Sequence, residues 1–196
     1  MAASGVDKAV EKVRRTVGSG GSHYEAQQMI KTIYHRHKAR RQLEESYAVL
    51  QEGAKLQLQA KQVTCGVELG LLLVEAFTAD QPPIDIALPA LLSIIDSMPG
   101  SLPAATEDAL VDEEARLVSA AVKWAHRCGG PSAGPPAAAA LHDAYAGHLW
   151  RAYGWRRMGL ASSHFARGAD AGAFAAAVAG CAAAAPEAEA PLFVAR

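Results

Sequence analysis

The chain has 196 residues, of which 51% are hydrophobic and 20% are charged. These values are typical of a folded globular protein and exclude a chain that is disordered throughout. The 19 Lys and Arg residues nearly balance the 20 Asp and Glu residues, so the overall charge gives no argument for a general polyanion-binding protein.

The charges are unevenly distributed along the chain. Residues 1–63 hold 11 basic and 6 acidic residues, a balance of +5. Residues 64–196 hold 8 basic and 14 acidic residues, a balance of −6. A basic N-terminal third therefore precedes an acidic remainder.

Cysteine usage and hydropathy indicate a cytosolic protein. Cys65, Cys128 and Cys181 are widely spaced and form no CxxC pair, which favours reduced thiols over a disulfide framework. The N-terminus lacks the apolar run of a secretory signal. The longest uncharged apolar stretch, residues 171–185, is shorter than a membrane span, so we expect no direct membrane insertion.

The hydrophobic periodicity is helical almost everywhere, and no alternating run of β-branched residues predicts a strand. Ser22 and Glu25 have the spacing of a capping box, so we expect a helix to begin there. The stretch from Cys128 to Pro136 is rich in Gly and Pro and is predicted to be the main loop. Apolar series predict further helices over about 43–58, 63–81, 84–98, 110–126 and 141–152, a shorter segment with Trp155, Leu160 and Phe165, and an alanine-rich helix over 171–185.

These helices are predicted to pair as hairpins of roughly 40 residues, a length within the range of helical repeat families. The predicted pairs cover about 5–37, 40–78, 84–126 and 137–168. Because each pair buries its apolar face only against its neighbours, we expect an all-α protein, an α-solenoid of irregular TPR-like antiparallel hairpins. Residues 1–196 are interpreted as a single solenoid domain. An irregular helical bundle is the alternative.

Phosphate-binding and metal-binding chemistry find little support in the sequence. No Gly-Lys-Ser/Thr follows the glycines at 18–21, so a Walker loop is excluded. His35 and His37 are two residues apart, which points them to different sides of a helix. His126, Cys128 and His142 match no closed zinc site in their spacing.

Catalytic chemistry finds no support either. Ser162, Ser163 and His164 are adjacent, but neighbours in a helix do not face one another. The tryptophans Trp124, Trp150 and Trp155 are predicted to pack within hairpins. We expect a protein that is not an enzyme and holds no cofactor or metal.

The basic N-terminal third has three interpretations. Its cations are a solvated helix surface, a docking face for an acidic partner, or a nucleic-acid face. The last is disfavoured because Tyr24 and Tyr34 are too few for a base-stacking surface. The residues concerned are Lys8, Lys12, Arg14, Arg15, Lys31, Arg36, Lys38, Arg40 and Arg41.

Several short segments resemble, in their order along the chain, the Golgi-to-ER traffic protein 4 family. The longest runs from Tyr24 to Thr32 (YEAQQMIKT) and continues through Arg36. The similarity starts at about Val10 and covers most of the chain. The other segments are Gly53-Ala54, Leu69 to Glu75 (LGLLLVE), Val118-Ser119, Val122 to Trp124, Leu141-His142, Leu149-Trp150, His164-Phe165 and Ala169-Asp170.

The resemblance implies a cytosolic, non-enzymatic adaptor for tail-anchored protein insertion into the ER membrane. In that family the N-terminal helices dock a dimeric targeting ATPase in its nucleotide-bound closed form. The C-terminal half binds a ubiquitin-like-domain partner that recruits a co-chaperone. The resemblance places Lys31 and Arg36 on the ATPase-docking face, and charge and position add Lys12 and Arg15.

The sequence departs from the family at its end. Family members continue through further helices, whereas this chain stops at Arg196, so the region of about 170–196 is expected to be an incomplete solenoid end. The site of the ubiquitin-like partner is then expected to be largely missing. The alternative function is a generic TPR-like module that binds a peptide or helix of a protein partner.

Overall fold

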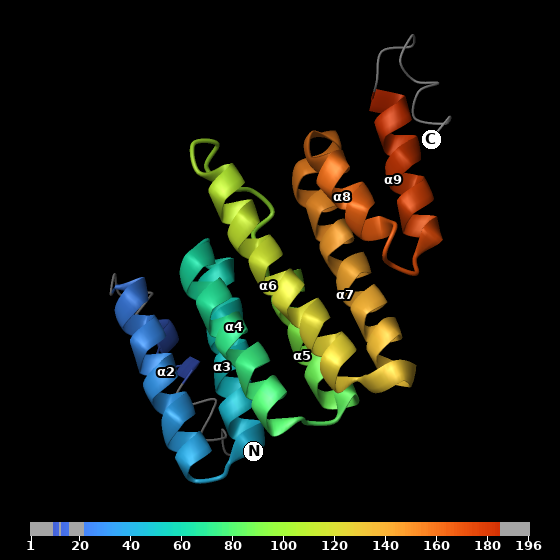
Figure 1. Ribbon diagram of the computed structural model, residues 1–196. Coiled ribbons are helices and arrows are strands. Elements are labelled where there is room, and N and C mark those ends of the chain that lie inside the picture. Colours follow the sequence, from blue (N-terminus) through green and yellow to red (C-terminus); the bar gives the residue numbers. More distant parts are fainter. Residues whose placement is uncertain (1–9, 12, 16–21, 185–196) are drawn as a thin grey trace, which may run out of the picture.

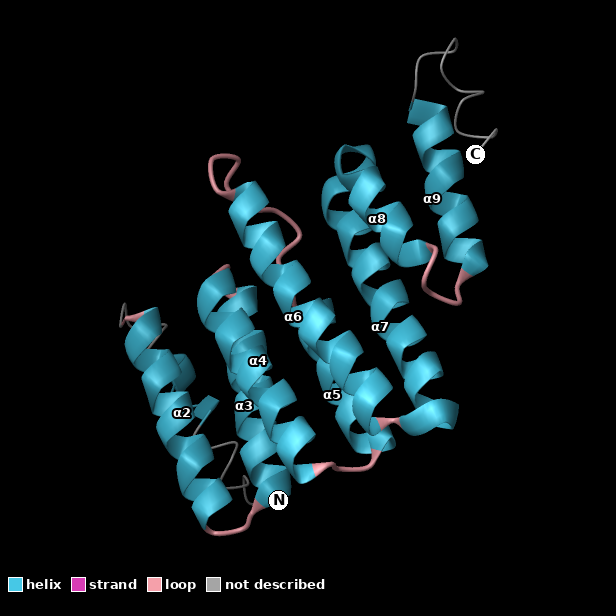
Figure 2. Cartoon of the chain, viewed as in Figure 1, coloured by secondary structure: helices cyan, strands magenta, loops and turns pink. Residues whose placement is uncertain are grey.

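The computed structural model describes residues 10–11, 13–15 and 22–184, and these residues are helical with short connections (Figures 1 and 2). No strand occurs among them, which confirms the all-α prediction. The helices are α2 (His23–Ala39), α3 (Leu43–Gln59), α4 (Val63–Asp80), α5 (Ile84–Asp96), α6 (Glu107–Cys128), α7 (Gly130–Tyr153), the 3-10 helix η1 (Gly154–Arg157), α8 (Met158–Phe165) and α9 (Ala171–Ala184).

The helices form an extended array of two layers. Helices α2, α4 and α6 lie side by side in one layer, and α3, α5 and α7 lie behind them in the other (Figure 1). Successive helices run antiparallel, as in a helical solenoid. The predicted pairing of residues 84–126 is wrong in detail, because α5 packs mainly against α7 and α6 packs mainly against α4 and α7.

The turns between α2 and α3 and between α3 and α4 repeat one backbone geometry. Arg41 and Lys61 adopt positive φ values of 59° and 61°. The following residues, Gln42 and Gln62, donate their backbone N–H groups to the carbonyls of His37 and Gln57. Two consecutive helix junctions are therefore equivalent in structure although their sequences differ.

Helix α4 is the most enclosed helix of the first layer. Leu69, Leu73 and Phe77 are fully buried within it. Glycines allow its neighbours to approach closely. A Cβ atom on Gly66 would lie 2.6 Å from Cγ of Leu58, and one on Gly70 would lie 2.9 Å from Cδ2 of Leu117.

Helix α7 begins much earlier than the sequence predicted. The prediction of a loop over residues 128–136 is wrong, because α6 ends at Cys128 and α7 starts at Gly130. Pro131 lies in the first turn, where a backbone N–H has no intrahelical acceptor to lose. Gly134 lets the two helices approach, since a Cβ there would lie 2.8 Å from the carbonyl oxygen of Ala125.

Helix α2 begins at His23, close to the predicted position, but the predicted capping box does not form. Ser22 occupies the N-cap, yet its hydroxyl makes no capping hydrogen bond. Its backbone carbonyl accepts the N–H of Ala26 at 3.0 Å. The start of this helix is therefore set by the packing of its apolar side.

A buried polar pair lies between α6 and α7. Glu114 is completely buried and His148 is 4% exposed. The Nε2 atom of His148 lies 3.4 Å from Oε2 of Glu114, without the geometry of a hydrogen bond. The rings of Tyr145 and Tyr153 flank the imidazole, with centroids 6.0 and 6.2 Å away.

Candidate protein-docking surface

One side of α2 carries a line of large polar and aromatic side chains, most of them exposed. Tyr24, Gln28, Lys31 and His35 follow one another at helical spacing, which places them on one side of the helix. Tyr24 is 64% exposed, and Gln28 and His35 are exposed as well. We call these four residues the α2 outer face.

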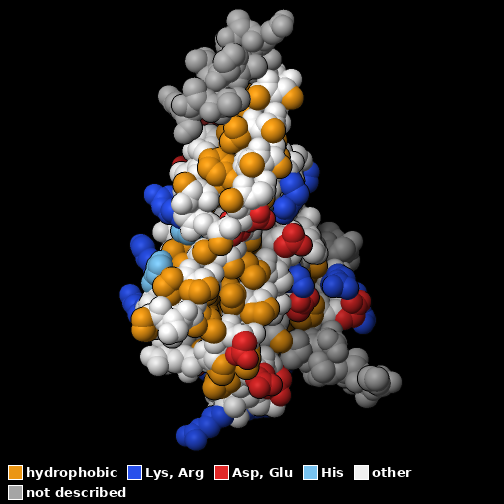
Figure 3. All heavy atoms as spheres, turned by 90° about the vertical axis from the view of Figure 1, so that its right-hand side faces the viewer, with side chains coloured by type: hydrophobic (Ala, Val, Ile, Leu, Met, Phe, Trp, Pro, Cys, Tyr) orange, Lys and Arg blue, Asp and Glu red, His pale blue; other side chains and the backbone are white. Residues whose placement is uncertain are grey.

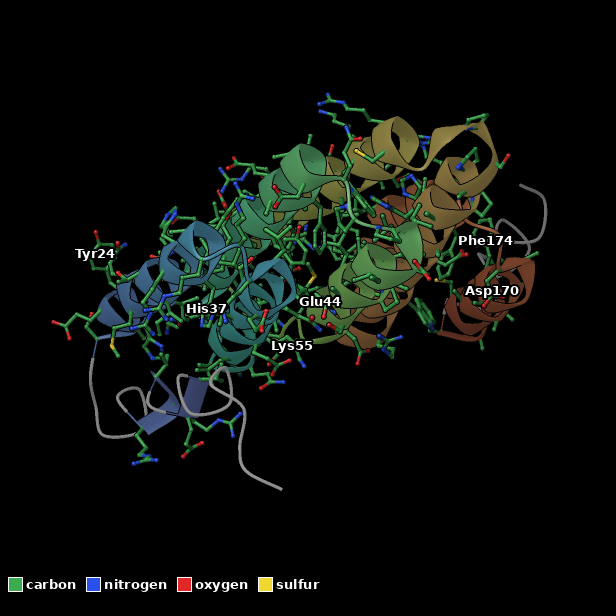
Figure 4. The ribbon with its side chains drawn as sticks, turned by 90° about the horizontal axis from the view of Figure 1, so that it is seen from below. Tyr24, His37, Glu44, Lys55, Asp170 and Phe174 are labelled. Carbon is green, nitrogen blue, oxygen red and sulfur yellow. The ribbon has the colours of Figure 1, made fainter. Side chains whose placement is uncertain are left out.

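The opposite side of α2 is apolar and fixes the orientation of the helix. Ala26, Ile30, Tyr34 and His37 are buried against the rest of the array. Figure 4 shows Tyr24 pointing away from the molecule and His37 pointing toward the neighbouring helix. A hydrogen bond of 3.1 Å joins Nδ1 of His37 to Oε1 of Gln42, so this histidine belongs to the α2–α3 turn.

Lys31 lies at the border between α2 and α4 and is partly neutralised. Its Nζ donates to Oε2 of Glu68 at 3.1 Å, and Nε2 of Gln27 donates to the same oxygen at 2.7 Å. The hydrogen bond from Lys31, with a smaller contribution from Gln27, lowers the pKa of the Glu68 carboxyl. Gln27 is 1% exposed, so this part of the family-like segment serves helix packing.

The four residues predicted to form the docking site do not gather in one place. Arg36 is exposed, but it follows Lys31 by five residues and therefore lies about 140° around the helix axis from it. Arg15 is exposed, and its Nε lies 3.4 Å from Oε1 of Glu11. Lys12 lies outside the described residues. Their joint role in docking stays a prediction.

The end of α2 adds further positive charge. Nζ of Lys38 donates to Oδ2 of Asp80 at 3.0 Å, and the hydroxyl of Tyr47 donates to the same oxygen at 3.0 Å. Partial burial lowers the pKa of Lys38, but the hydrogen bonds to Asp80 and Tyr34 and the charges of these two groups together more than offset this, so the pKa is raised overall. Arg40 and Arg41, in the turn that follows, are exposed.

The three residues considered for a zinc site, His126, Cys128 and His142, do not form one. Nδ1 of His142 lies 2.9 Å from Nδ1 of His164, whereas His126 is exposed on α6. Among residues 10–11, 13–15 and 22–184, no group of three or more His, Cys, Asp or Glu side chains could hold a metal ion. The His142–His164 pair is therefore a hydrogen-bonded pair of imidazoles.

The adjacent Ser162, Ser163 and His164 do not form a catalytic arrangement. The hydroxyl of Ser162 donates to the carbonyl of Gly159 at 3.1 Å, and that of Ser163 donates to the carbonyl of Leu160 at 2.8 Å. These bonds tie both hydroxyls to the preceding helical turn. His164 faces His142 instead.

Two exposed aromatic side chains were missed in the sequence. Tyr24 was considered as a base-stacking residue and as the first residue of the family-like segment, although its helical spacing to Gln28 and His35 already placed it on the polar side of α2. Trp155 was predicted to pack within a hairpin, and this is wrong because it is 69% exposed. It follows Gly154, whose φ of 57° turns the chain out of α7.

Within the described part of the chain, no helix combines enough length with enough apolarity to span a membrane. This finding agrees with the short apolar stretches of the sequence.

Known proteins resemble this chain in sequence and in fold. The family model described as Golgi to ER traffic protein 4 matches residues 40–196. Protein GET4 from Arabidopsis thaliana is 29% identical over 190 residues, which covers 87% of this chain and 57% of that protein. The crystal structure of C. therm. Get4 matches with a TM-score of 0.73 at 19% identity, covering 97% of this chain and 57% of that chain. The chain thus spans a little over half the length of these relatives.

Proposed function

Because the chain belongs to the Golgi to ER traffic protein 4 family, we propose that it is a non-enzymatic adaptor in the cytosolic targeting of tail-anchored proteins to the ER membrane. In this proposal the N-terminal helices dock the targeting ATPase of the pathway. A link to a ubiquitin-like and co-chaperone complex is the second part of the proposal and rests on the family alone.

The observation that carries the docking proposal is the α2 outer face. Tyr24 is an exposed aromatic side chain, and Tyr is among the residues that most often anchor protein interfaces. Gln28 and His35 continue the same side of the helix with hydrogen-bonding groups. Tyr24, Gln28 and His35 are exposed, so a partner can reach them, whereas Lys31 is partly covered by its contact with Glu68 of α4.

Exposed cations near α2, outside the α2 outer face, also support the docking proposal. Arg36, Arg40 and Arg41 are exposed near the end of α2, and Arg15 adds a further cation. Such charges accelerate the encounter with an acidic partner and fix its orientation more than they add affinity. Lys31 contributes less free charge than its position in the sequence predicted, because Glu68 binds it.

The test is binding of this chain to the targeting ATPase with an ATP analogue, with ADP and without nucleotide. We expect binding that depends on the nucleotide and that weakens as salt rises, because exposed charges are screened. Tyr24→Ala should weaken binding by about tenfold or more, the effect of losing an interface anchor. Ile86→Ala is the matched control, since Ile86 is a 47% exposed hydrophobic residue on α5.

Two outcomes would contradict the proposal. Binding that is equal in all nucleotide states, or that Ile86→Ala weakens as much as Tyr24→Ala, would argue against docking through α2. No binding by a folded chain, together with displaceable binding of short peptides, would instead favour the generic helical-repeat module. Pull-down of the ubiquitin-like partner by the same chain tests the second part of the proposal separately.

A further inference from the structure

A second set of exposed basic side chains lies far from α2 along the array, on the last two turns of α6 and just after α8. The set consists of Lys123, His126, Arg127 and Arg167, and we call it the α6–α8 cationic patch. Within the described residues, none of the four forms an ion pair with a carboxylate. Arg167 donates only to the carbonyl of Ser163, at 2.9 Å.

Neighbouring histidines respond to this positive charge. Burial, followed by the charges of His142 and Arg167, lowers the pKa of His164 to about 4. Burial, followed by the charges of Arg167 and His126, lowers the pKa of His142. The positive potential therefore extends from α6 across α7 to α8.

Asp143 raises the pKa of the neighbouring His142 by its charge, but within the described residues it forms no ion pair with the patch. Oδ2 of Asp143 accepts the backbone N–H of Ala169 at 2.8 Å and that of Asp170 at 3.2 Å, so this carboxylate serves the loop before α9. Oδ1 of Asp170 accepts the N–H of Ala173 at 2.8 Å. In Figure 3, Lys, Arg and His side chains follow one another along the left edge, the side of the α2, α4 and α6 layer, without Asp or Glu among them.

The surroundings of the patch select the kind of partner. Its exposed neighbours Ser119, Ala166 and Ala169 are small. The exposed large hydrophobic residues of the described chain lie elsewhere, at Tyr24, Leu43, Ile86 and Trp155. The patch thus lacks the apolar groups with which a surface inserts into a membrane and the aromatic groups on which nucleic-acid bases stack.

We propose that the α6–α8 cationic patch is a docking surface for a partner protein, which binds through a short segment rich in Asp and Glu. Lys123 and Arg127 lie one turn apart on α6 and offer two adjacent cations to such a segment. Arg167 approaches from α8 and adds a guanidinium that binds a carboxylate in two-point geometry. This surface is separate from the α2 outer face, so the chain would join two partners along one array.

The test uses the full chain and a fluorescein-labelled poly-Glu peptide, with binding followed by fluorescence anisotropy at low and moderate salt. The patch variant carries Lys123→Glu, Arg127→Glu and Arg167→Glu. The control carries Lys61→Glu, Arg151→Glu and Arg156→Glu, which change the net charge equally at exposed sites that belong to neither proposed docking surface. Far-ultraviolet circular dichroism verifies that both variants are folded.

We expect the patch variant to weaken peptide binding by about tenfold and the control to change it by less than about threefold. Equal weakening by both variants would overturn the proposal, because net charge alone would then explain it. The absence of peptide binding by the wild-type chain at low salt would also overturn it. Equally tight binding of an oligothymidylate at the same patch would also overturn the proposal, because the patch would then bind polyanions in general.

Discussion

The Glu114–His148 pair offers the sharpest test of how the two layers are held together. Both side chains are buried between α6 and α7, and the closest approach of their polar atoms is 3.4 Å. Glu114→Ala removes the carboxylate and leaves the imidazole enclosed without a charged partner. We expect this change to destabilise the fold strongly.

The expected magnitude follows from the burial of both groups, whose polar atoms approach to 3.4 Å. Removing one partner of a buried pair typically costs about 3–5 kcal/mol, because the other is left uncompensated. Replacing both, as in Glu114→Leu with His148→Phe, removes the unpaired group and should recover most of that loss.

Urea unfolding followed by circular dichroism measures the free energies of unfolding of the single and double variants. Glu113→Ala is the matched control, since Glu113 is adjacent but pairs with Arg116 at the surface, where loss costs about 1 kcal/mol or less. The reasoning is refuted if Glu114→Ala costs no more than Glu113→Ala. It is also refuted if the double variant is as unstable as the sum of its single changes.

Two further predictions concern stability. The pKa of His164 is about 4 in the folded chain against an ordinary value of 6.5, so the unfolded chain binds more protons between these values. The contribution of His164 to the free energy of unfolding is therefore fully present above about pH 6.5, and the free energy of unfolding falls by up to about 3 kcal/mol as the pH drops to about 4. Urea titrations at several pH values measure this profile, and His164→Phe should flatten it between these pH values. Gly66→Ala should lower the free energy of unfolding by about 1–3 kcal/mol, because the added Cβ would meet Leu58. Gly159→Ala, in open space on α8, should leave it unchanged or raise it by up to about 1 kcal/mol. Thermal melts that rank the two variants in the reverse order would contradict the packing described for α3 and α4.

Local patterns predicted most of the helices. The apolar series over about 43–58 and 63–81 correspond to α3 and α4, which begin at Leu43 and Val63. The start of α7 was missed because prolines usually end a helix. Pro131 instead lies in the first turn of α7, where a backbone N–H has no intrahelical acceptor to lose. A close helix junction at Gly129 and Gly134 then replaces the expected loop.

The candidate site was less accessible from the sequence because its contacts join distant residues. Lys31 looked like a free docking cation, but its partner Glu68 is 37 residues away on another helix. His142 was grouped with its sequence neighbours, yet its partner His164 lies on α8. Spacing along one helix identifies a face, as for Tyr24, but it does not show which helix covers that face.

The central claim, that α2 presents the docking face, is tested most directly by site-specific photo-crosslinking to the targeting ATPase. A photoreactive amino acid replaces Gln28 on the α2 outer face in one sample and Glu44, exposed on α3, in the other. The account predicts a crosslink from position 28 that depends on the nucleotide bound to the ATPase and little or none from position 44. A crosslink from position 44 and none from position 28 would contradict it.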